Sequence, residues 1–402
     1  MPSAAKAASQ WTTYRFDQVA ELVNDRVDNP SQAGVDRYVG LEHLDAGSLR
    51  ISRWGEPSDV TATKLRFRRG DVIFGRRRVY QRKVAVADFE GICSAHAMVL
   101  RARPDAVLPE FLPYFMQTDL FMERALQISV GSLSPTINWK ALAKEEFALP
   151  PVEEQRRIAD ALGACSRVSG STRKLGFQAG VTLAALAESG LRGEELGQRS
   201  WHPRVGEYFA GWEVVQLGEL LDVCQYGLSD PLSESGEYPV LRMMNIAEGR
   251  VDQSDLKFID LASQDFERYR LIDGDVLFNR TNSYELVGRT GVYDIAGDHV
   301  FASYLVRLRP NLDSLDPYYL TAFLSAQVGR RQVLSYATRA VSQTNVSAGN
   351  LKRVLMPLPP IDYQRNLRQR MQRVRGAMAS VRARQRLIRG MERAALARVE
   401  SQ

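Results

Sequence analysis

The chain has 402 residues, of which 45% are hydrophobic and 25% charged, a composition typical of a soluble globular protein. This length suits two or three domains that each bury a core, and no apolar run approaches the roughly 18 residues of a membrane span. The formal charge of +6 suggests an anionic partner, although many basic proteins bind no nucleic acid.

The N-terminal sequence MPSAAKAASQW lacks the long apolar core of a signal peptide, so we expect a cytoplasmic protein with a loose tail over residues 1–10. Cys93, Cys165 and Cys224 lie far apart and form no CxxC pair. Together with four scattered histidines they do not supply the clustered ligands of a structural zinc site. We therefore expect reduced cysteines and no bound metal.

The first distinctive segment, KLRFRRGDVIFGRRRVYQRK (64–83), holds nine Lys and Arg residues against one Asp. Its DVIF core predicts a strand, with the basic side chains in flanking loops. The cations predicted to contact DNA phosphates are Arg76, Arg77, Arg78, Arg82 and Lys83, and Tyr80 and Gln81 are candidates for contacts to bases. The alternative is a solvated basic face without a specific partner.

The next predicted elements are a strand that ends at Arg103-Pro104, an amphipathic helix and a polar loop over 129–138. Pro150-Pro151 then ends an apolar strand and begins a helix, because proline donates no ladder hydrogen bond and suits the first helical turn. The apolar residues Ile158, Leu162, Cys165 and Val168 lie on one face of this helix. The pattern weakens around Gly170 and Gly176 and resumes at Val181, Leu183 and Leu186, and a polar, Gly-containing linker follows.

The second half of the chain repeats the first. Gly70–Phe74 recurs as Gly274–Phe278, 100–121 as 308–329, 129–138 as 335–345, and 147–158 as 355–367. The blocks keep the same order at nearly the same offset, which is far longer than the 20–50 residues of solenoid repeats. The sequence therefore predicts two similar domains in tandem.

The second copy carries a different polar loop, FNRTNSYELVGRTGVYD (278–294). Its side chains suit direct contacts to base edges, since Asn pairs with adenine and Arg with guanine in the major groove. The candidates are Asn279, Arg280, Thr281, Asn282, Ser283, Tyr284 and Arg289. Asn and Ser are also common turn residues, which leaves a purely structural role open for each.

The C-terminal segment predicts a second long helix whose apolar residues step by four and three. This seam comprises Leu367, Met371, Val374, Met378, Val381 and Ile388, continuing the pattern that Ile158 and Leu162 set in the first helix. Such a seam needs a partner, and the other repeat's helix is the nearest candidate; the alternative is that each helix packs on its own domain. Residues 361–402 also hold eleven Arg and no Lys, which would suit DNA phosphates, an acidic protein or solvent.

Catalytic motifs are missing from the sequence. It contains no Gly-Lys pair for a P-loop, and Asp316-Pro317-Tyr318 lacks the second proline of an amino-methyltransferase motif. Asp252, Asp255 and Lys257 could form a magnesium-dependent nuclease site, but turn and strand-edge roles explain them more simply. We therefore expect a protein that is not an enzyme.

The blocks ALPPVEEQRRIADAL and PLPPIDYQRNL, together with GDVLFNRTNSYELVGRTGVY, resemble the DNA specificity subunits of type I restriction-modification systems. The first copy departs from the family pattern at 74–82. The resemblance implies an α+β fold with two tandem target-recognition domains, each a mixed or antiparallel sheet with helices. These domains would lie head to tail around a pseudo-twofold axis, joined by two long helices that form an antiparallel coiled-coil spacer.

The domains expected on this basis are target-recognition domains at 1–150 and 211–360, spacer helices at 151–195 and 361–402, and a linker at 196–210. The resemblance further implies a non-catalytic subunit that recognises a bipartite, asymmetric site in double-stranded DNA. It would direct two adenine methyltransferase (M) subunits to that site and, where present, motor-nuclease restriction (R) subunits. No cofactor would bind to this chain; S-adenosylmethionine, and ATP with magnesium where a nuclease exists, would bind to the partners. A stand-alone DNA-binding protein, or a subunit of a related defence system, remains the alternative.

Overall fold

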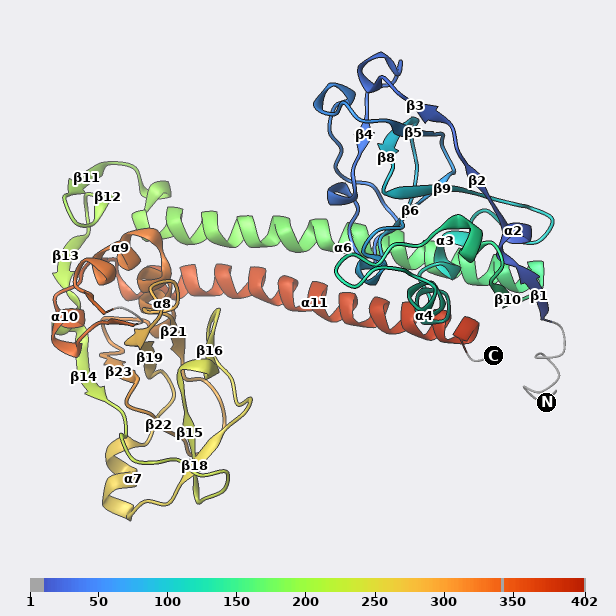
Figure 1. Ribbon diagram of the computed structural model, residues 1–402. Coiled ribbons are helices and arrows are strands. Elements are labelled where there is room, and N and C mark those ends of the chain that lie inside the picture. The colour runs from blue at the N-terminus through green and yellow to red at the C-terminus, as the bar shows by residue number, and fades with distance from the viewer. Residues whose placement is uncertain (1–10, 341–342, 401–402) are drawn as a thin grey trace. The chain divides into compact units, whose positions relative to one another are not determined.

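A computed structural model describes residues 11–340 and 343–400, so the tail expected at 1–10 lies outside the described residues. The chain divides into two compact units. Unit 1 runs to Lys174 and resumes at Arg382, and unit 2 extends from Leu175 to Val381. Two long helices, α6 (Val152–Arg192) and α11 (Ile361–Glu400), each contribute one part to both units (Figure 1).

Unit 1 contains one strand pair and two four-stranded sheets. The pair joins β1 (Thr12–Arg15) to β10 (Glu146–Leu149), and the sheets have the orders β2-β9-β6-β7 and β3-β5-β8-β4, with β4 and β8 parallel. The remaining strands are β2 (Ala20–Val23), β3 (Arg26–Val27), β4 (Tyr38–Val39), β5 (Lys64–Phe67), β6 (Val72–Gly75), β7 (Val84–Val86), β8 (Gly91–Ser94) and β9 (Ala97–Ala102). The short helices are α2 (Phe16–Val19), α3 (Leu112–Phe115), α4 (Asp119–Gln127) and α5 (Trp139–Leu142).

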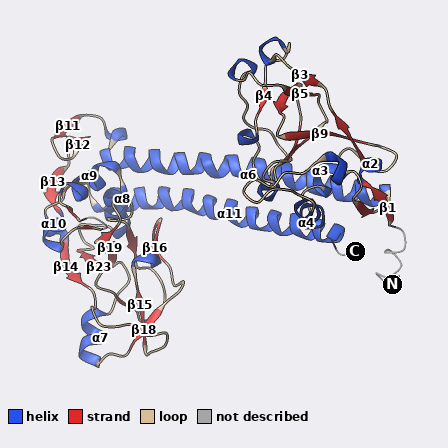
Figure 2. Ribbon diagram, viewed as in Figure 1, coloured by secondary structure: helices blue, strands red, loops and turns tan. Residues whose placement is uncertain are grey.

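Unit 2 contains a strand pair of β13 (Glu213–Gln216) with β26 (Leu355–Leu358), a hairpin of β11 (Arg199–His202) with β12 (Gly206–Phe209), and three sheets. The sheet orders are β14-β23-β19-β21-β17-β16, β18-β15-β22 and β20-β25-β24, with parallel pairs at β17–β21 and β15–β22. The strands of these sheets are β14 (Leu221–Tyr226), β15 (Tyr238–Leu241), β16 (Ile246–Ala247), β17 (Gly249–Val251), β18 (Lys257–Ile259), β19 (Val276–Asn279), β20 (Thr281–Asn282), β21 (Thr290–Val292), β22 (Val300–Phe301), β23 (Leu305–Pro310), β24 (Thr338–Arg339) and β25 (Thr344–Asn345). The helices are α7 (Ser263–Tyr269), α8 (Pro317–Ser325), α9 (Gln327–Ser335) and α10 (Ala348–Lys352). Figure 2 shows how short these strands are beside the two long helices.

The repeated Gly-Asp-Val-aliphatic-Phe block forms the central strand of each unit. Side chains alternate along a strand, so Val72 and Phe74 of β6 pack on the cluster that includes α3, α4 and α6, while Ile73 faces a second cluster. In β19, Val276 and Phe278 face the helices and Leu277 faces the opposite cluster. Both strands are buried on their two faces, which explains why the block is continuously apolar.

The Asp of each block forms a buried ion pair. Asp71 accepts two hydrogen bonds from Arg101 at 2.8 and 3.0 Å, and Asp275 accepts two from Arg309 at 2.7 and 2.9 Å. The preceding glycine has a positive φ in both units, 91° at Gly70 and 88° at Gly274, which an L side chain rarely adopts. The repeated motif is therefore a structural turn with an internal counter-ion.

The Gln of each Pro-Pro-x-x-x-Gln block joins the helix start to its unit. The Gln155 amide donates to the carbonyls of Ala106 and Pro150 and accepts from the N–H of Leu108. Gln364 makes the same three contacts, with Ser314, Pro359 and Asp316, at 2.8–2.9 Å. Both glutamines are buried, so the block is explained by fully satisfied polar groups at the helix entrance.

In unit 1, the first half of α6 packs against the end of α11. Ile158 and Leu162 share one buried cluster with Val399, and Cys165 lies close enough to Glu392 for that carboxylate to raise the pKa of the thiol, after the larger effect of burial. Ile388 is also buried. Advancing along α6 in this unit corresponds to moving backward along α11, so the two segments are antiparallel.

In unit 2, the end of α6 packs against the start of α11 in the same antiparallel sense. A Cβ on Gly176 would lie 3.3 Å from Val381, and a Cβ on Gly190 would lie 2.4 Å from the Leu367 side chain. Leu367 and Met371 are buried here, and the remaining predicted seam residues, Val374, Met378 and Val381, are half-buried. The fold class expected from the sequence, α+β domains with paired long helices, is confirmed.

Three local expectations need revision. Val168 and Val181 are exposed, because the seam continues through the small residues Ser169, Thr172, Gly176 and Ala179. The expected linker contains the hairpin of β11 (Arg199–His202) and β12 (Gly206–Phe209). The amphipathic helix of each unit is split in two; in unit 1, Thr118 caps the second piece by accepting from the N–H of Phe121.

Candidate nucleic-acid interface

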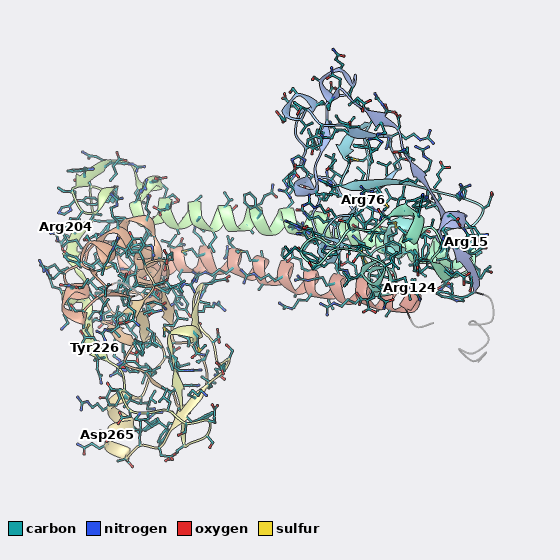
Figure 3. All side chains as sticks on the ribbon, in the orientation of Figure 1. Arg15, Arg76, Arg124, Arg204, Tyr226 and Asp265 are labelled. Carbon is teal, nitrogen blue, oxygen red and sulfur yellow. The ribbon has the colours of Figure 1, made fainter. Side chains whose placement is uncertain are left out.

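The basic loop of unit 1 follows β6 and is held between two other segments. The Arg76 N–H donates to the carbonyl of His96 at 3.1 Å, in the turn between β8 and β9. On its other side, the Ile137 N–H donates to the Arg76 carbonyl at 3.0 Å, and the Arg78 N–H donates to Pro135 at 2.8 Å. The polar loop 129–137 and the turn at His96 therefore join the arginine loop in one surface, and Figure 3 labels Arg76 within it.

The exposed side chains of the arginine loop itself are Arg77, Arg78 and Tyr80. Tyr80 is 54% exposed, and Arg78 adopts a left-handed backbone with φ of 56°. The Arg78 guanidinium lies 3.5 Å from the hydroxyl of Ser134, and that of Arg77 lies 3.3 Å from the His96 ring. These cations face no carboxylate within ion-pair distance among the described residues, so they are available to an anion.

Two of the other predicted phosphate contacts, Arg82 and Lys83, are bonded to groups of the protein itself. Arg82 pairs with Asp119 at 2.5 Å and donates to the carbonyl of Gln117, and Lys83 donates to the carbonyl of Leu41 at 2.6 Å. Arg76 and Gln81 are half-buried. The structure thus gives Arg82 and Lys83 a role in fixing the loop, which the charge pattern alone did not reveal.

His96 is a further group of this surface. Partial burial lowers the pKa of its imidazole, and the charges of Arg77, Arg76 and Lys64 lower this pKa further. Both effects favour the neutral ring in the free protein. A phosphate placed on Arg77 would weaken that repulsion and favour the protonated ring.

Unit 2 forms its polar surface on the same frame, meaning the buried Asp–Arg pair and the backbone contacts that hold the loop. The Arg280 N–H donates to the carbonyl of Tyr304, and the Val346 N–H donates to the Arg280 carbonyl. Strand β20 pairs with β25, which places Thr281 opposite Asn345. Arg280 thus corresponds to Arg76 and Tyr304 to His96, so three loops again converge.

Within this surface the predicted residues divide by exposure. Arg280 is held internally, by the Ser303 carbonyl, the Asn345 amide and the ring of Tyr226 at 4.7 Å. Asn279 and Thr281 are buried, Asn282 and Ser283 are half-buried, and Tyr284 and Arg289 are exposed. The Arg339 guanidinium lies 4.0 Å from the centre of the Tyr284 ring.

A cleft of about 750 Å³ opens beside this loop. Its lining includes the predicted residues Asn279, Asn282 and Arg289, together with Met243, Met244 and Tyr304. Asn282 donates to the Met243 sulfur at 3.2 Å. The cleft therefore combines apolar walls with amide and cationic groups, and the carboxylate of Asp230 also lines it.

The loops of His96, Thr136, Tyr304 and Asn345 were not among the predicted contacts. The polar segments 129–138 and 335–345 form one of the repeated blocks, and their repetition is the feature of the sequence that could have indicated a role in the interface. The turns at His96 and Tyr304 have no distinctive amino-acid composition. Only the order of the strands places them in the three-loop surfaces.

The nuclease interpretation of Asp252, Asp255 and Lys257 finds no support in the geometry. Asp255 pairs with Arg242 at 3.1 Å, Asp252 accepts from Ser254, and Lys257 pairs with Glu234. Among residues 11–340 and 343–400, no three His, Cys, Asp or Glu side chains could jointly hold a metal ion. In the same part of the chain, no helix is long and apolar enough to cross a membrane.

Comparison with known proteins gives a family match over most of the chain. The model described as the type I restriction modification DNA specificity domain matches residues 8–174 and again 210–385. A putative type I restriction enzyme specificity subunit of Methanocaldococcus jannaschii is 32% identical over 40% of this chain and 39% of its own length. The EcoKI specificity subunit of Escherichia coli K12 is 26% identical over 70% of this chain and 62% of its own. The chain thus aligns with less than two thirds of either relative.

Two solved structures share the fold. The S subunit of a type I restriction-modification system from M. genitalium superposes with a TM-score of 0.65 and 13% identity, covering 97% of this chain and 96% of that one. A chain from a type I R-M complex gives a TM-score of 0.56 and 22% identity, covering 97% of both chains. At these identities the likeness concerns the fold alone.

Proposed function

The chain belongs to the type I restriction-modification DNA specificity family, and from this membership we propose that it is the non-catalytic subunit that recognises DNA. Each unit would present one three-loop surface to one half of a double-stranded site. In unit 1 that surface comprises the loops at 76–83, 94–96 and 129–137, and in unit 2 the loops at 279–289, 302–304 and 344–345.

The observation that carries this proposal is the contrast between shared frame and different loops. The frame is the same in both units, including the Asp–Arg pair and the backbone contacts of Arg76 and Arg280. The exposed loop groups are arginines and Tyr80 in unit 1, but Tyr284 and Arg289 beside an amide-lined cleft in unit 2. Two equal frames with unequal contact groups suit a bipartite site whose halves differ in sequence.

Direct contacts would come from different residue types in the two units. In unit 1, Arg77 and Arg78 would neutralise phosphates, and Tyr80 and Gln81 would reach bases. In unit 2, Asn279, Asn282 and Arg289 would contact base edges, while Arg280 would hold the loop. Helices α6 and α11 would act as a spacer; 41 residues span about 60 Å at 1.5 Å per residue, ample for half-sites about 34 Å apart.

The partners proposed for the chain are two adenine methyltransferase subunits and, where the system includes them, restriction subunits. S-adenosylmethionine would bind to the methyltransferase, and ATP with magnesium to the restriction subunit. Methylation requires the target base to leave the helix, so the specificity subunit would hold the duplex while its partners act on that base.

Expression of the chain with its neighbouring genes, followed by sequencing of modified adenines, tests this function. We expect a methyltransferase to co-purify and a split motif with two unlike halves to be methylated. Specific DNA binding without a co-purifying methyltransferase or methylation would instead favour the stand-alone DNA-binding alternative. Absence of any sequence-specific binding would refute both.

A further inference from the structure

The 750 Å³ cleft of unit 2 has features that contact with an intact base stack does not explain. We propose that it receives a single nucleobase that has left the stack of the bound DNA, and that the Asn279 carboxamide contacts the edge of this base. The inference rests on the proposed function, because it names what one DNA-binding surface holds.

The first reason to propose a nucleobase in this cleft is the side chain of Asn279. Its side chain is 1% exposed and lines the cleft, and neither its amide nitrogen nor its amide oxygen has a hydrogen-bond partner among the described residues. Side-chain alternation along β19 places it on the same face as Leu277, toward the cluster of Ile246 and Phe301 and away from the helices. A buried amide without partners is destabilising, and a ligand that offers one donor and one acceptor would satisfy it.

The walls of the cleft suit the faces of a planar base. Met243 is 37% exposed, Met244 56% and Tyr304 46%, so three large side chains of the cleft wall are accessible to a ligand. Aromatic and thioether groups stack on any base, whatever its hydrogen-bonding edge. Arg289 is exposed on the same cleft and has no ion pair among the described residues, so it is available to contact a base edge beside the cleft.

The concave shape decides between an intact and an unstacked base. Base edges of an intact duplex lie at the floor of a groove and are reached by elements that project into it. A hollow surface cannot enter a groove, whereas an unstacked nucleotide projects outward and can enter a hollow. The cleft volume is ample for one nucleotide.

Unit 1 fills the corresponding space. Gly75 stands where unit 2 has Asn279, and a Cβ on Gly75 would lie 3.2 Å from Lys83 and 3.3 Å from Leu41. Lys83 is bonded to the Leu41 carbonyl across this position. The cleft is therefore a property of unit 2 and not of the shared frame.

The test uses the full chain together with its co-purifying subunits. The DNA is a set of duplexes that contain the motif identified by sequencing of modified adenines. An abasic site is placed at each position of the half-site recognised by unit 2, and binding is measured. One position should weaken wild-type binding by about tenfold or more, and Asn279→Leu should bind the intact and the abasic duplex equally. 2-Aminopurine at that position should gain fluorescence on binding the wild type and not on binding Asn279→Leu.

A stability readout separates this role from a structural one. Asn279→Leu removes an unpartnered amide, so its unfolding temperature should equal or exceed that of the wild type. Asn245 is the matched control, since it is buried in the same unit but bonded to Arg242 and Ser254; Asn245→Leu should lower that temperature. A second variant, Ala247→Phe, would fill the cleft from an exposed position and should abolish the same abasic discrimination.

The outcomes are distinct. If the wild type discriminates its motif but no position shows an Asn279-dependent abasic effect, the cleft proposal is wrong and the proposed function stands. Destabilisation by Asn279→Leu to the level of Asn245→Leu would also overturn it, because Asn279 would then be structural. If the wild type does not discriminate the motif at all, the proposed function itself fails.

Discussion

Replacement of Arg77 and Arg78 by alanine should weaken the DNA affinity of the complex and flatten its dependence on salt. These two guanidinium groups are exposed on the unit 1 surface and face no carboxylate within ion-pair distance in the described chain. Arg82 and Lys83 belong to the same basic segment, but they are bonded to Asp119 and to a backbone carbonyl. The segment therefore has fewer cations free to bind DNA than its formal charge suggests.

The magnitude follows from counterion release. Each neutralised phosphate contributes about 0.9 to the slope of log affinity against log salt, so losing two contacts should reduce the slope by about 1.8. Over a fourfold rise in salt, from about 50 to 200 mM, this corresponds to roughly a tenfold smaller loss of affinity than in the wild type.

Fluorescence anisotropy on a labelled duplex across that salt range measures the slope. Arg77→Lys with Arg78→Lys is the matched control: it keeps both charges and should keep the wild-type slope, although lysine lacks the planar fork of arginine. A wild-type slope in the double alanine variant would refute this assignment of the phosphate contacts. A slope reduced equally by the lysine pair would show that charge is not the cause.

Three further predictions concern single residues. Gln364→Ala should lower the free energy of unfolding in urea by about 2–4 kcal/mol, since it leaves the N–H of Asp316 and two carbonyls unpaired; no change would contradict the helix-entrance role. Because the pKa of His96 lies below its usual value in the free protein and a phosphate on Arg77 would raise it, binding should take up a proton. Affinity at constant ionic strength should thus rise as pH falls from 8 to 6, and His96→Gln should abolish that rise; equal profiles would exclude this coupling. Burial, with a smaller effect of Asp71, raises the pKa of Cys93 to about 12, so this thiol should resist alkylation at pH 8 until the protein unfolds; rapid native labelling would contradict its burial.

The central strands and the helix seam were predictable because each follows from a local pattern of apolar residues, and the repeat was predictable because its blocks recur in the same order. Val72 to Phe74 and Val276 to Phe278 are continuous apolar runs, which is what a strand buried on both faces requires. The steps of four and three from Leu367 to Ile388 likewise identified the buried side of α11.

The groups that complete each surface were not predictable in the same way. His96 meets Arg77 because the turn that holds His96 leads directly into β9, which pairs with β6, and no pattern within either segment records that contact. In the sequence, Arg82 and Arg280 cannot be distinguished from arginines that are free to bind DNA. In the structure, residues distant in the sequence hold both side chains. The sequence pattern of the α6 seam is interrupted near Gly176 because small residues occupy the seam there. These small residues are enough to continue the helix contact because Val381 of α11 lies directly opposite.

The claim that two units recognise two different half-sites is tested most directly by exchanging one unit. Residues 211–360 should be replaced by the matching segment of a relative, because these bounds keep the paired strands β13 and β26 together. The modified-adenine motif is then sequenced in cells that express the chimera with the partner genes. We expect one half of the motif to change while the other half and the gap stay the same. A change in both halves, or methylation that loses its motif altogether, would contradict the account.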